Sequence, residues 1–257
     1  MCAFILIGTG LNPGRHLTLE AVDAVKSVER VFAETYTSRM PDGWIEVIES
    51  RTGRKVETLD RVSVEKGDIL ISACETGGVS LLVPGDPLTA TTHIHLIEEM
   101  EKRNIKVRVI PGVSILSVAP GLLGLQAYKF GRTVSLPRWR PGFEPVSPLE
   151  HILENLRLGL HTLILLDTEP EPMSASEAGS QLLCMSERSG TETLTRDTMI
   201  CVVARACFDD QTLLYLPLGR LPEVNPGPPP HSLVIPGSLH FIEKQRLERI
   251  RVSSDIA

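Results

Sequence analysis

Long hydrophobic runs are absent from this sequence. No apolar stretch approaches the ~18 residues that a membrane-spanning helix requires. The apolar N-terminal segment, residues 1–7, has no basic region before it and no small-residue cleavage site after it, and Gly8 ends it. We therefore expect neither a membrane span nor a secretory signal, and we expect a soluble, cytoplasmic protein.

The sequence also lacks an excess of positive charge and any paired cysteine motif. It has 26 Lys and Arg residues against 32 Asp and Glu residues, which gives a formal net charge of −6. Domains that bind nucleic acid are usually basic, so we expect no direct binding to RNA or DNA. The five cysteines form no C-x-x-C pair, which argues against a metal site and against a disulfide framework.

What is present is an alternation of short apolar runs with segments of helical period. This pattern predicts an α/β fold with a largely parallel sheet. The predicted strands cover residues 3–7, 30–33, 68–73, 79–83, 105–109, 133–136, 161–166, 199–206, 213–218 and 232–235. The predicted helices cover residues 19–28, 148–158, 175–186 and 241–250, and one more runs from a cap at Thr91 or Thr92 to about Arg103. Residues 41–65 fit neither pattern. We expect two domains, residues 1–127 and 128–257.

Three loops follow predicted strands at their carboxyl ends, where ligands bind in open α/β sheets. They are Gly8-Thr9-Gly10, Gly85-Asp86-Pro87 and the segment 111–115. A carboxylate at the second loop can accept hydrogen bonds from an amine or a ribose hydroxyl. A nicotinamide site is an alternative, but the glycine spacing departs from G-x-G-x-x-G because the third glycine comes one residue late. Plain turns, with no ligand, are the other alternative for each loop taken alone.

Several sequence runs together resemble the diphthine synthases. They occur in the order of that family and span nearly the whole chain: FILIGTGL (4–11), AETYTS (33–38), PGDPLTATTH (84–93), GLQAYKFG (124–131), GLHTL (159–163), VARA (203–206) and HSLVIPG (231–237). The ATTH run and the GLQ-Y-FG run distinguish this family from the wider tetrapyrrole methylases.

The resemblance implies a two-domain, tetrapyrrole-methylase-like α/β fold. The sheet of the N-terminal domain would be largely parallel and that of the C-terminal domain mixed. S-adenosyl-L-methionine would bind in a cleft between the domains of a homodimer. By motif, the cofactor contacts carried over to this sequence are Leu11, Asp86, Thr89, Ser114, Ile115, Leu166, Ala206 and His231.

The activity implied is repeated methylation of the amine of a 3-amino-3-carboxypropyl-histidine on translation elongation factor 2, which gives diphthine. The resemblance supplies no catalytic residue. The main alternative is a methyltransferase that acts on a tetrapyrrole of the precorrin type. A nicotinamide oxidoreductase and a non-catalytic binding module are weaker alternatives. Arg138, Trp139, Arg140 and Lys129 are candidates for docking the partner protein, because arginine and tryptophan are frequent interface residues.

Overall fold

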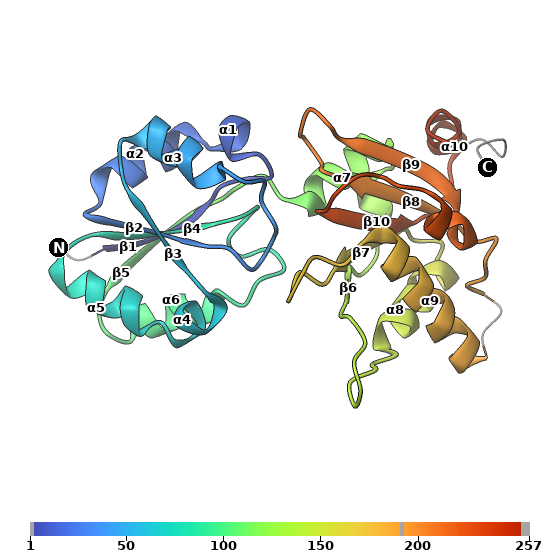
Figure 1. The fold of residues 1–257 in the computed structure, drawn as a ribbon, viewed down its shortest axis with the longest axis horizontal. Coiled ribbons are helices and arrows are strands. Elements are labelled where there is room, and N and C mark those ends of the chain that lie inside the picture. Colours follow the sequence, from blue (N-terminus) through green and yellow to red (C-terminus); the bar gives the residue numbers. More distant parts are fainter. Residues whose placement is uncertain (1–2, 191–192, 253–257) are drawn as a thin grey trace. The chain divides into compact units, whose positions relative to one another are not determined.

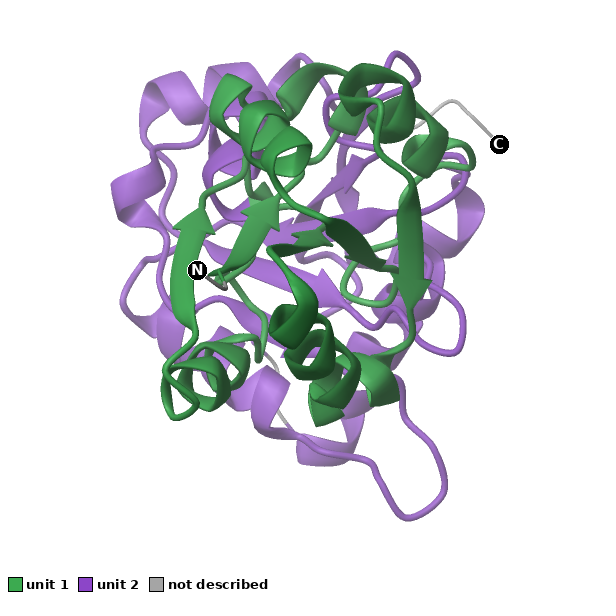
Figure 2. Ribbon diagram, turned by 90° about the vertical axis from the view of Figure 1, so that its left-hand side faces the viewer, with its two compact units in different colours: residues 1–115 green, residues 116–257 purple. Residues whose placement is uncertain are grey.

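The computed structural model describes residues 3–190 and 193–252 (Figure 1). Two compact units make up the chain, Met1–Ile115 and Leu116–Ala257, shown in green and purple in Figure 2. The sequence placed a domain boundary later, after residue 127. Each unit contains one five-stranded sheet, so the predicted α/β class is confirmed.

The first unit has a parallel sheet with strand order β3-β2-β4-β1-β5. The strands are β1 (Ala3–Gly8), β2 (Arg30–Glu34), β3 (Val56–Leu59), β4 (Val79–Val83) and β5 (Lys106–Ile110). The helices are α1 (Pro13–His16), α2 (Leu19–Ser27), α3 (Trp44–Thr52), α4 (Arg61–Lys66), α5 (Asp68–Thr76) and α6 (Ile94–Glu101). Helices α1 to α3 lie on one face of the sheet and α4 to α6 on the other (Figure 1). Since both faces are covered, the central strands have to be apolar along their whole length.

Local chemistry explains several of these elements. Every residue of β4 is buried, and four of its five residues are apolar, as a strand covered on both faces requires. Helix α2 begins where the Thr18 hydroxyl accepts a hydrogen bond from Ala21 N at 3.0 Å, which confirms the predicted cap. The unassigned segment 41–65 contains α3, β3 and α4.

Two local predictions were wrong. Residues 68–73 form the start of helix α5 and not a strand, and Leu70, Ala73 and Cys74 give that helix a buried stripe at helical spacing. Helix α6 is capped by neither Thr91 nor Thr92, because it begins after His93 and has no side-chain cap. Instead, the Thr91 hydroxyl donates to Pro87 O at 2.6 Å and stabilises the loop before the helix.

The second unit has a mixed sheet with strand order β6-β7-β10-β8-β9, as expected for the C-terminal half. Only β6 and β7 are parallel neighbours, and the other pairs are antiparallel. The strands are β6 (Val134–Leu136), β7 (Thr162–Leu166), β8 (Met199–Ala204), β9 (Thr212–Pro217) and β10 (His231–Ile235). The helices are α7 (Ile115–Leu123), α8 (Ser147–Arg157), α9 (Ala175–Ser189) and α10 (Phe241–Glu248), with 3-10 turns η1 (Ala127–Lys129) and η2 (Leu218–Glu223). Within the described ranges, no helix is long and apolar enough to cross a membrane.

Candidate active site

Three loops meet at the carboxyl edge of the first sheet. Strands β4, β1 and β5 are parallel neighbours, so the loops that follow them leave the sheet side by side. Gly8, Gly85 and Gly112 pack directly on one another there. A Cβ on Gly8 would lie 2.6 Å from Gly85 O, and one on Gly112 would lie 2.1 Å from the same oxygen. The close approach of these backbones requires glycine at Gly8 and Gly112.

The first two loops are also joined by their backbones. Gly10 N donates to Gly85 O and Gly85 N donates to Gly10 O, each at 3.0 Å. Both glycines have positive φ angles, +71° and +74°, which side chains other than glycine rarely adopt. Leu11, the first predicted cofactor contact, directly follows this bridge.

Asp86 joins the second loop to the third. Its Oδ1 accepts hydrogen bonds from Leu88 N at 3.0 Å and from the Thr89 hydroxyl at 2.8 Å, and its Oδ2 accepts one from Gly112 N at 3.2 Å. A carboxylate offers about four acceptor positions, so these three bonds leave room for a ligand donor. The structure thus brings Asp86 and Thr89 together, and places Ser114 and Ile115 just beyond Gly112.

A second polar group links this edge to the neighbouring strand β2. The Tyr36 hydroxyl lies 3.1 Å from His93 Nε2, and His93 Nδ1 lies 3.0 Å from Pro87 O. Because a carbonyl only accepts, Nδ1 carries the proton and the Tyr36 hydroxyl donates to Nε2. His93 is buried, and burial lowers its pKa, so the neutral ring is favoured. The Tyr36–His93 pair therefore fixes the Asp86 loop to the segment after β2.

Glu34, the last residue of β2, begins that segment. Its side chain is fully buried, and its Oε2 accepts hydrogen bonds from Tyr36 N and Thr37 N, both at 2.9 Å. Oε1 is buried and has no hydrogen-bond partner within residues 3–190 and 193–252. Burial raises the pKa of Glu34 against the lowering effect of these hydrogen bonds. Nothing in the sequence indicated that the side chain of Glu34 is buried.

In the second unit, three predicted contacts gather at one edge of the mixed sheet. Strands β7 and β8 run in the same direction and flank β10, which runs against both. Ser232 pairs with Leu165 and His231 pairs with Ala204, so the ends of β7 and β8 meet the start of β10. Leu166, Ala206 and His231 therefore lie along the same edge of this unit.

The imidazole of His231 is fully engaged by its own unit. Nδ1 accepts a hydrogen bond from Ala175 N at 3.1 Å, so Nε2 carries the proton and donates to Gly227 O at 3.1 Å. Burial lowers the pKa of this ring, which keeps it neutral. Any ligand contact of His231 is thereby limited to its backbone or to ring carbon atoms.

Arg205 organises the same edge, a role that the sequence did not suggest. Its guanidinium donates to the Asp210 carboxylate, to Pro228 O and to Asp210 O, at distances of 2.6 to 2.7 Å. A Cβ on Gly227 would lie 2.5 Å from Nη1 of this arginine. The backbone of Arg205 has a positive φ of +48°, which is uncommon for a residue with a side chain of this size. Such strained backbone is often found at functional sites.

The remaining family runs of the second unit meet at a buried carboxylate, Glu243. Its side chain accepts hydrogen bonds from His161 Nε2 at 3.2 Å, Gln126 N at 2.9 Å and His240 N at 2.7 Å, and it pairs with Lys129 Nζ. His161 in turn accepts from Gly237 N through Nδ1 at 2.9 Å. These contacts connect segments 124–131, 159–163 and 231–237, so the shared runs there build a structural network.

The candidate docking residues are also engaged within this unit. Lys129 pairs with buried Glu243 and also donates to Ser238 O. Arg138 pairs with Glu177, and the Trp139 indole donates to Pro145 O at 3.1 Å. Their internal contacts explain these three residues without a partner protein. No group of three or more His, Cys, Asp or Glu side chains suited to a metal occurs within the described residues.

Known proteins match both the sequence and the fold. The family model described as Tetrapyrrole (Corrin/Porphyrin) Methylases matches residues 3–222. A diphthine synthase of Methanothermobacter thermautotrophicus is 40% identical over 248 residues, covering 95% of this chain and 94% of the relative. One from Methanocaldococcus jannaschii is 38% identical and covers 95% and 97%. A crystal structure of diphthine synthase superposes with a TM-score of 0.87 at 30% identity, covering 97% of this chain and 96% of the other.

The fold and the family model define a methyltransferase of the tetrapyrrole methylase class. Membership in this class argues against two alternatives considered from the sequence, a nicotinamide oxidoreductase and a non-catalytic binding module. Within the class, the chain belongs to the diphthine synthase family, which confirms the resemblance drawn from its sequence runs.

Proposed function

We propose that this methyltransferase acts in diphthamide biosynthesis. It would transfer methyl groups from S-adenosyl-L-methionine to the amine of 3-amino-3-carboxypropyl-histidine on translation elongation factor 2. The names of the relatives support the product, since diphthine is that amino acid in methylated form. The observation that carries the proposal is the meeting of three strand-end loops at Gly8, Gly85 and Gly112 beside Asp86, because the partly exposed Asp86 carboxylate keeps an acceptor position at this strand edge.

The chain's own residues suit a folded sulfonium cofactor. Asp86 retains acceptor capacity for a hydroxyl or ammonium group, and Thr89 keeps it oriented. Glycine backbone lets a ligand approach closely. We propose that these cofactor contacts are the eight carried over from the family: Leu11, Asp86, Thr89, Ser114, Ile115, Leu166, Ala206 and His231.

The cofactor supplies an activated methyl group, and the protein has to align that methyl with a nitrogen lone pair. Alignment of this kind contributes a large part of the rate of a displacement reaction. Positive charge disperses as sulfur is released, so apolar surroundings free of water favour the transition state. The attacking amine has to be neutral, because an ammonium ion has no lone pair.

The decisive experiment mixes the purified protein with S-adenosyl-L-methionine and elongation factor 2 that carries the unmethylated arm. Mass spectrometry of the factor should show added mass in steps of one methyl group at a single histidine. Isothermal titration should show binding of S-adenosylhomocysteine. A protein that binds this ligand but leaves the factor unmodified would refute the proposed substrate.

The family description also names corrins and porphyrins, so a tetrapyrrole is the second candidate substrate. Incubation with labelled cofactor and a precorrin would favour it if label entered the macrocycle and not elongation factor 2.

We further propose that the protein works as a homodimer in the cytoplasm, where its protein substrate would be available. Light scattering after gel filtration should give twice the chain mass of 28.2 kDa. A mass equal to one chain at micromolar concentration would contradict the dimer.

A further inference from the structure

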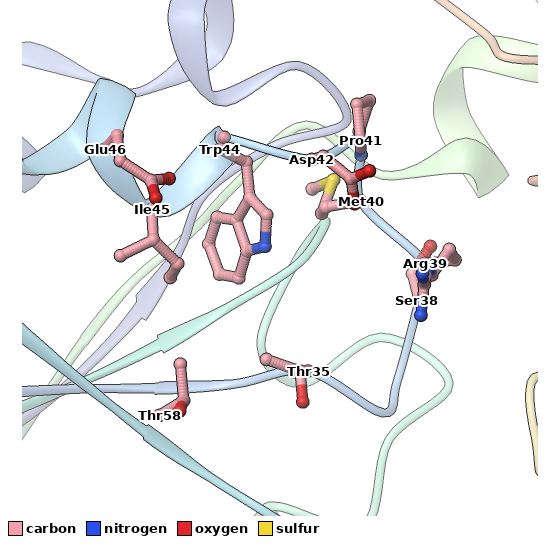
Figure 3. A pocket seen from close by; sticks show the side chains of 11 residues that line it. Thr35, Ser38, Arg39, Met40, Pro41, Asp42, Trp44, Ile45, Glu46 and Thr58 are labelled. Atoms are coloured by element: carbon pink, nitrogen blue, oxygen red, sulfur yellow. The ribbon is translucent and has the colours of Figure 1, made fainter.

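A cavity of about 390 Å³ lies in the first unit, over the carboxyl ends of β2 and β3. The segment from β2 to the start of α3 forms most of its wall, and Thr58 of β3 completes it (Figure 3). None of the eight proposed cofactor contacts lines it. It lies at the edge of the sheet where α/β proteins bind ligands, over β2, the strand next to the one that leads into the Asp86 loop.

Both signs of charge line this cavity. Arg39 contributes a guanidinium group, and Asp42 and Glu46 contribute carboxylates. All three residues are exposed, and within residues 3–190 and 193–252 their side chains form no hydrogen bond or salt bridge with the protein, while Glu46 also interacts electrostatically with Lys55. The charges of the cavity are thus available to a ligand.

An aromatic wall accompanies the charges. The indole of Trp44 extends from the start of α3 toward the strand ends that carry Thr35 and Thr58 (Figure 3). Cations, including quaternary ammonium groups, bind favourably to the face of an indole ring. The cavity therefore offers a surface for a cationic group whether or not that group can still donate a hydrogen bond.

A chain of hydrogen bonds connects the segment that lines the cavity with the loop that contains Asp86. Strand β2 lies next to β4, and neighbouring strands are roughly 5 Å apart. Tyr36, in the cavity segment, donates to His93, which in turn holds Pro87 beside Asp86. A group bound in the cavity would therefore lie over the strand next to the one that leads into the proposed cofactor loop.

We propose that this cavity binds the amino-acid end of the substrate arm, a group that carries an amine and a carboxylate on one carbon atom. Arg39 pairs with the carboxylate, and Asp42 and Glu46 attract the arm while its nitrogen is an ammonium ion. A proton leaves that nitrogen for solvent before each transfer, and Trp44 packs against the methylated nitrogen. This inference rests on the proposed function and assigns its substrate a place. A bidentate guanidinium contact is the strongest means of orienting a carboxylate.

The experiment measures methyl transfer to elongation factor 2 that carries the unmethylated arm, together with binding of S-adenosylhomocysteine. Arg39→Gln and the double variant Asp42→Asn/Glu46→Gln should each lower kcat/KM by roughly tenfold or more, mainly through KM, as expected for lost contacts to charged groups. Ligand affinity should stay within about twofold, which also shows that the variants are folded. Arg103→Gln and Glu101→Gln are matched controls, because both residues are exposed and lie outside the cavity.

Trp44→Leu provides a readout that a purely structural role would not change. Loss of the indole weakens binding of the more highly methylated arm most, so mass spectrometry should show accumulation of forms with fewer methyl groups. Wild-type protein that methylates the factor while all three cavity variants retain its kcat/KM and methyl count would overturn this inference alone. Wild-type protein that fails to methylate the factor would overturn the proposed function and the inference with it.

Discussion

Each of the two units buries one glutamate almost completely, and the two glutamates are satisfied very differently. Glu243 of the second unit has four hydrogen-bond donors on its two oxygens. Glu34 of the first unit has two backbone donors on one oxygen, and its other oxygen is buried with no partner in the described part of the chain. Hydrogen bonding decides the outcome: burial alone raises the pKa of either group, yet the donors lower that of Glu243 to about 2, whereas that of Glu34 remains raised.

The difference separates a structural carboxylate from one beside a candidate site. Glu243 connects three segments of its unit, and the four donors from this unit use the acceptor positions of its carboxylate. Glu34 ends a strand next to the Asp86 loop and holds the backbone of Tyr36, whose hydroxyl bonds to His93 in front of that loop. A buried oxygen without a hydrogen-bond partner is unusual in a native protein, and such groups are often found beside ligand sites.

The largest expected effect is the loss of stability in Glu243→Gln. The variant leaves Lys129 and His161 without their anionic partner, and breaking a buried ion pair typically costs about 3–5 kcal/mol. The free energy of unfolding from urea denaturation at pH 7 should fall by roughly that amount. Glu187→Gln, on the exposed end of α9, is the control and should change stability by less than about 0.5 kcal/mol.

The same variant has a definite pH dependence. The folded pKa of Glu243, about 2, is below the reference value of 4.5, so its ionised form stabilises the fold above pH 4.5. That contribution is lost as the pH falls from 4.5 toward 2, and the difference between wild type and variant should shrink over this range. A difference that stays constant from pH 7 to pH 3 would show that the charge of Glu243 is unimportant.

The next largest effect is on cofactor binding in Asp86→Ala. If the carboxylate holds the cofactor, affinity for S-adenosylhomocysteine should drop by about 1.5–3 kcal/mol, the range for a hydrogen bond to a charged group. Titration calorimetry measures this loss directly. Asp23→Ala, at an exposed position of α2, should bind as wild type does, and equal affinity of both variants would remove Asp86 from the site.

A smaller effect is expected for Tyr36→Phe. The change removes the donor to His93 Nε2 and leaves a buried nitrogen unsatisfied, which should lower the free energy of unfolding by about 1 kcal/mol. Cofactor affinity should fall less than in Asp86→Ala, because Tyr36 acts only through the position of the loop. Tyr128→Phe is the matched control, since the side chain of Tyr128 is 80% exposed.

Glu34→Gln should give the smallest change, within about 1 kcal/mol at pH 7, and the opposite pH trend to Glu243→Gln. The raised folded pKa of Glu34 means that its protonated form suits the fold, and that stability is lost as the pH rises above 4.5 through the folded pKa. The uncharged variant escapes this loss, so its stability relative to wild type should improve from pH 4 to pH 8. If the stability of both variants relative to wild type changed in the same direction with pH, the contrast drawn between Glu34 and Glu243 would be wrong.

Much of the fold could be predicted because its local signals are strong. The segment 79–83, apolar except for Ser80, predicts a buried strand, and Thr18 predicts a helix start, as found. The error at residues 68–73 has a physical cause: the short, mostly apolar segment DILISA shows no clear period, and only its continuation to Thr76 reveals a helical stripe.

The site could be predicted only in part. The three loops of the first unit were recognisable because each follows an apolar run and contains glycine. The partners of buried groups were not, since Gln126 and Glu243 are 117 positions apart and only the folded sheet brings them together. The Tyr36–His93 contact likewise depends on β2 lying next to β4, an order that differs from the order along the chain.

The contact of Gly8, Gly85 and Gly112 limits which substitutions the sequence can tolerate at these positions. Each of the three belongs to a different loop, yet a single methyl group added to Gly8 or Gly112 collides with the carbonyl oxygen of Gly85. No side chain can rotate aside to relieve the clash, because the obstacle is main chain. Insertions and substitutions in these loops are therefore compatible with the fold only away from this contact. At the contact itself, glycine has to be kept at Gly8 and Gly112 together.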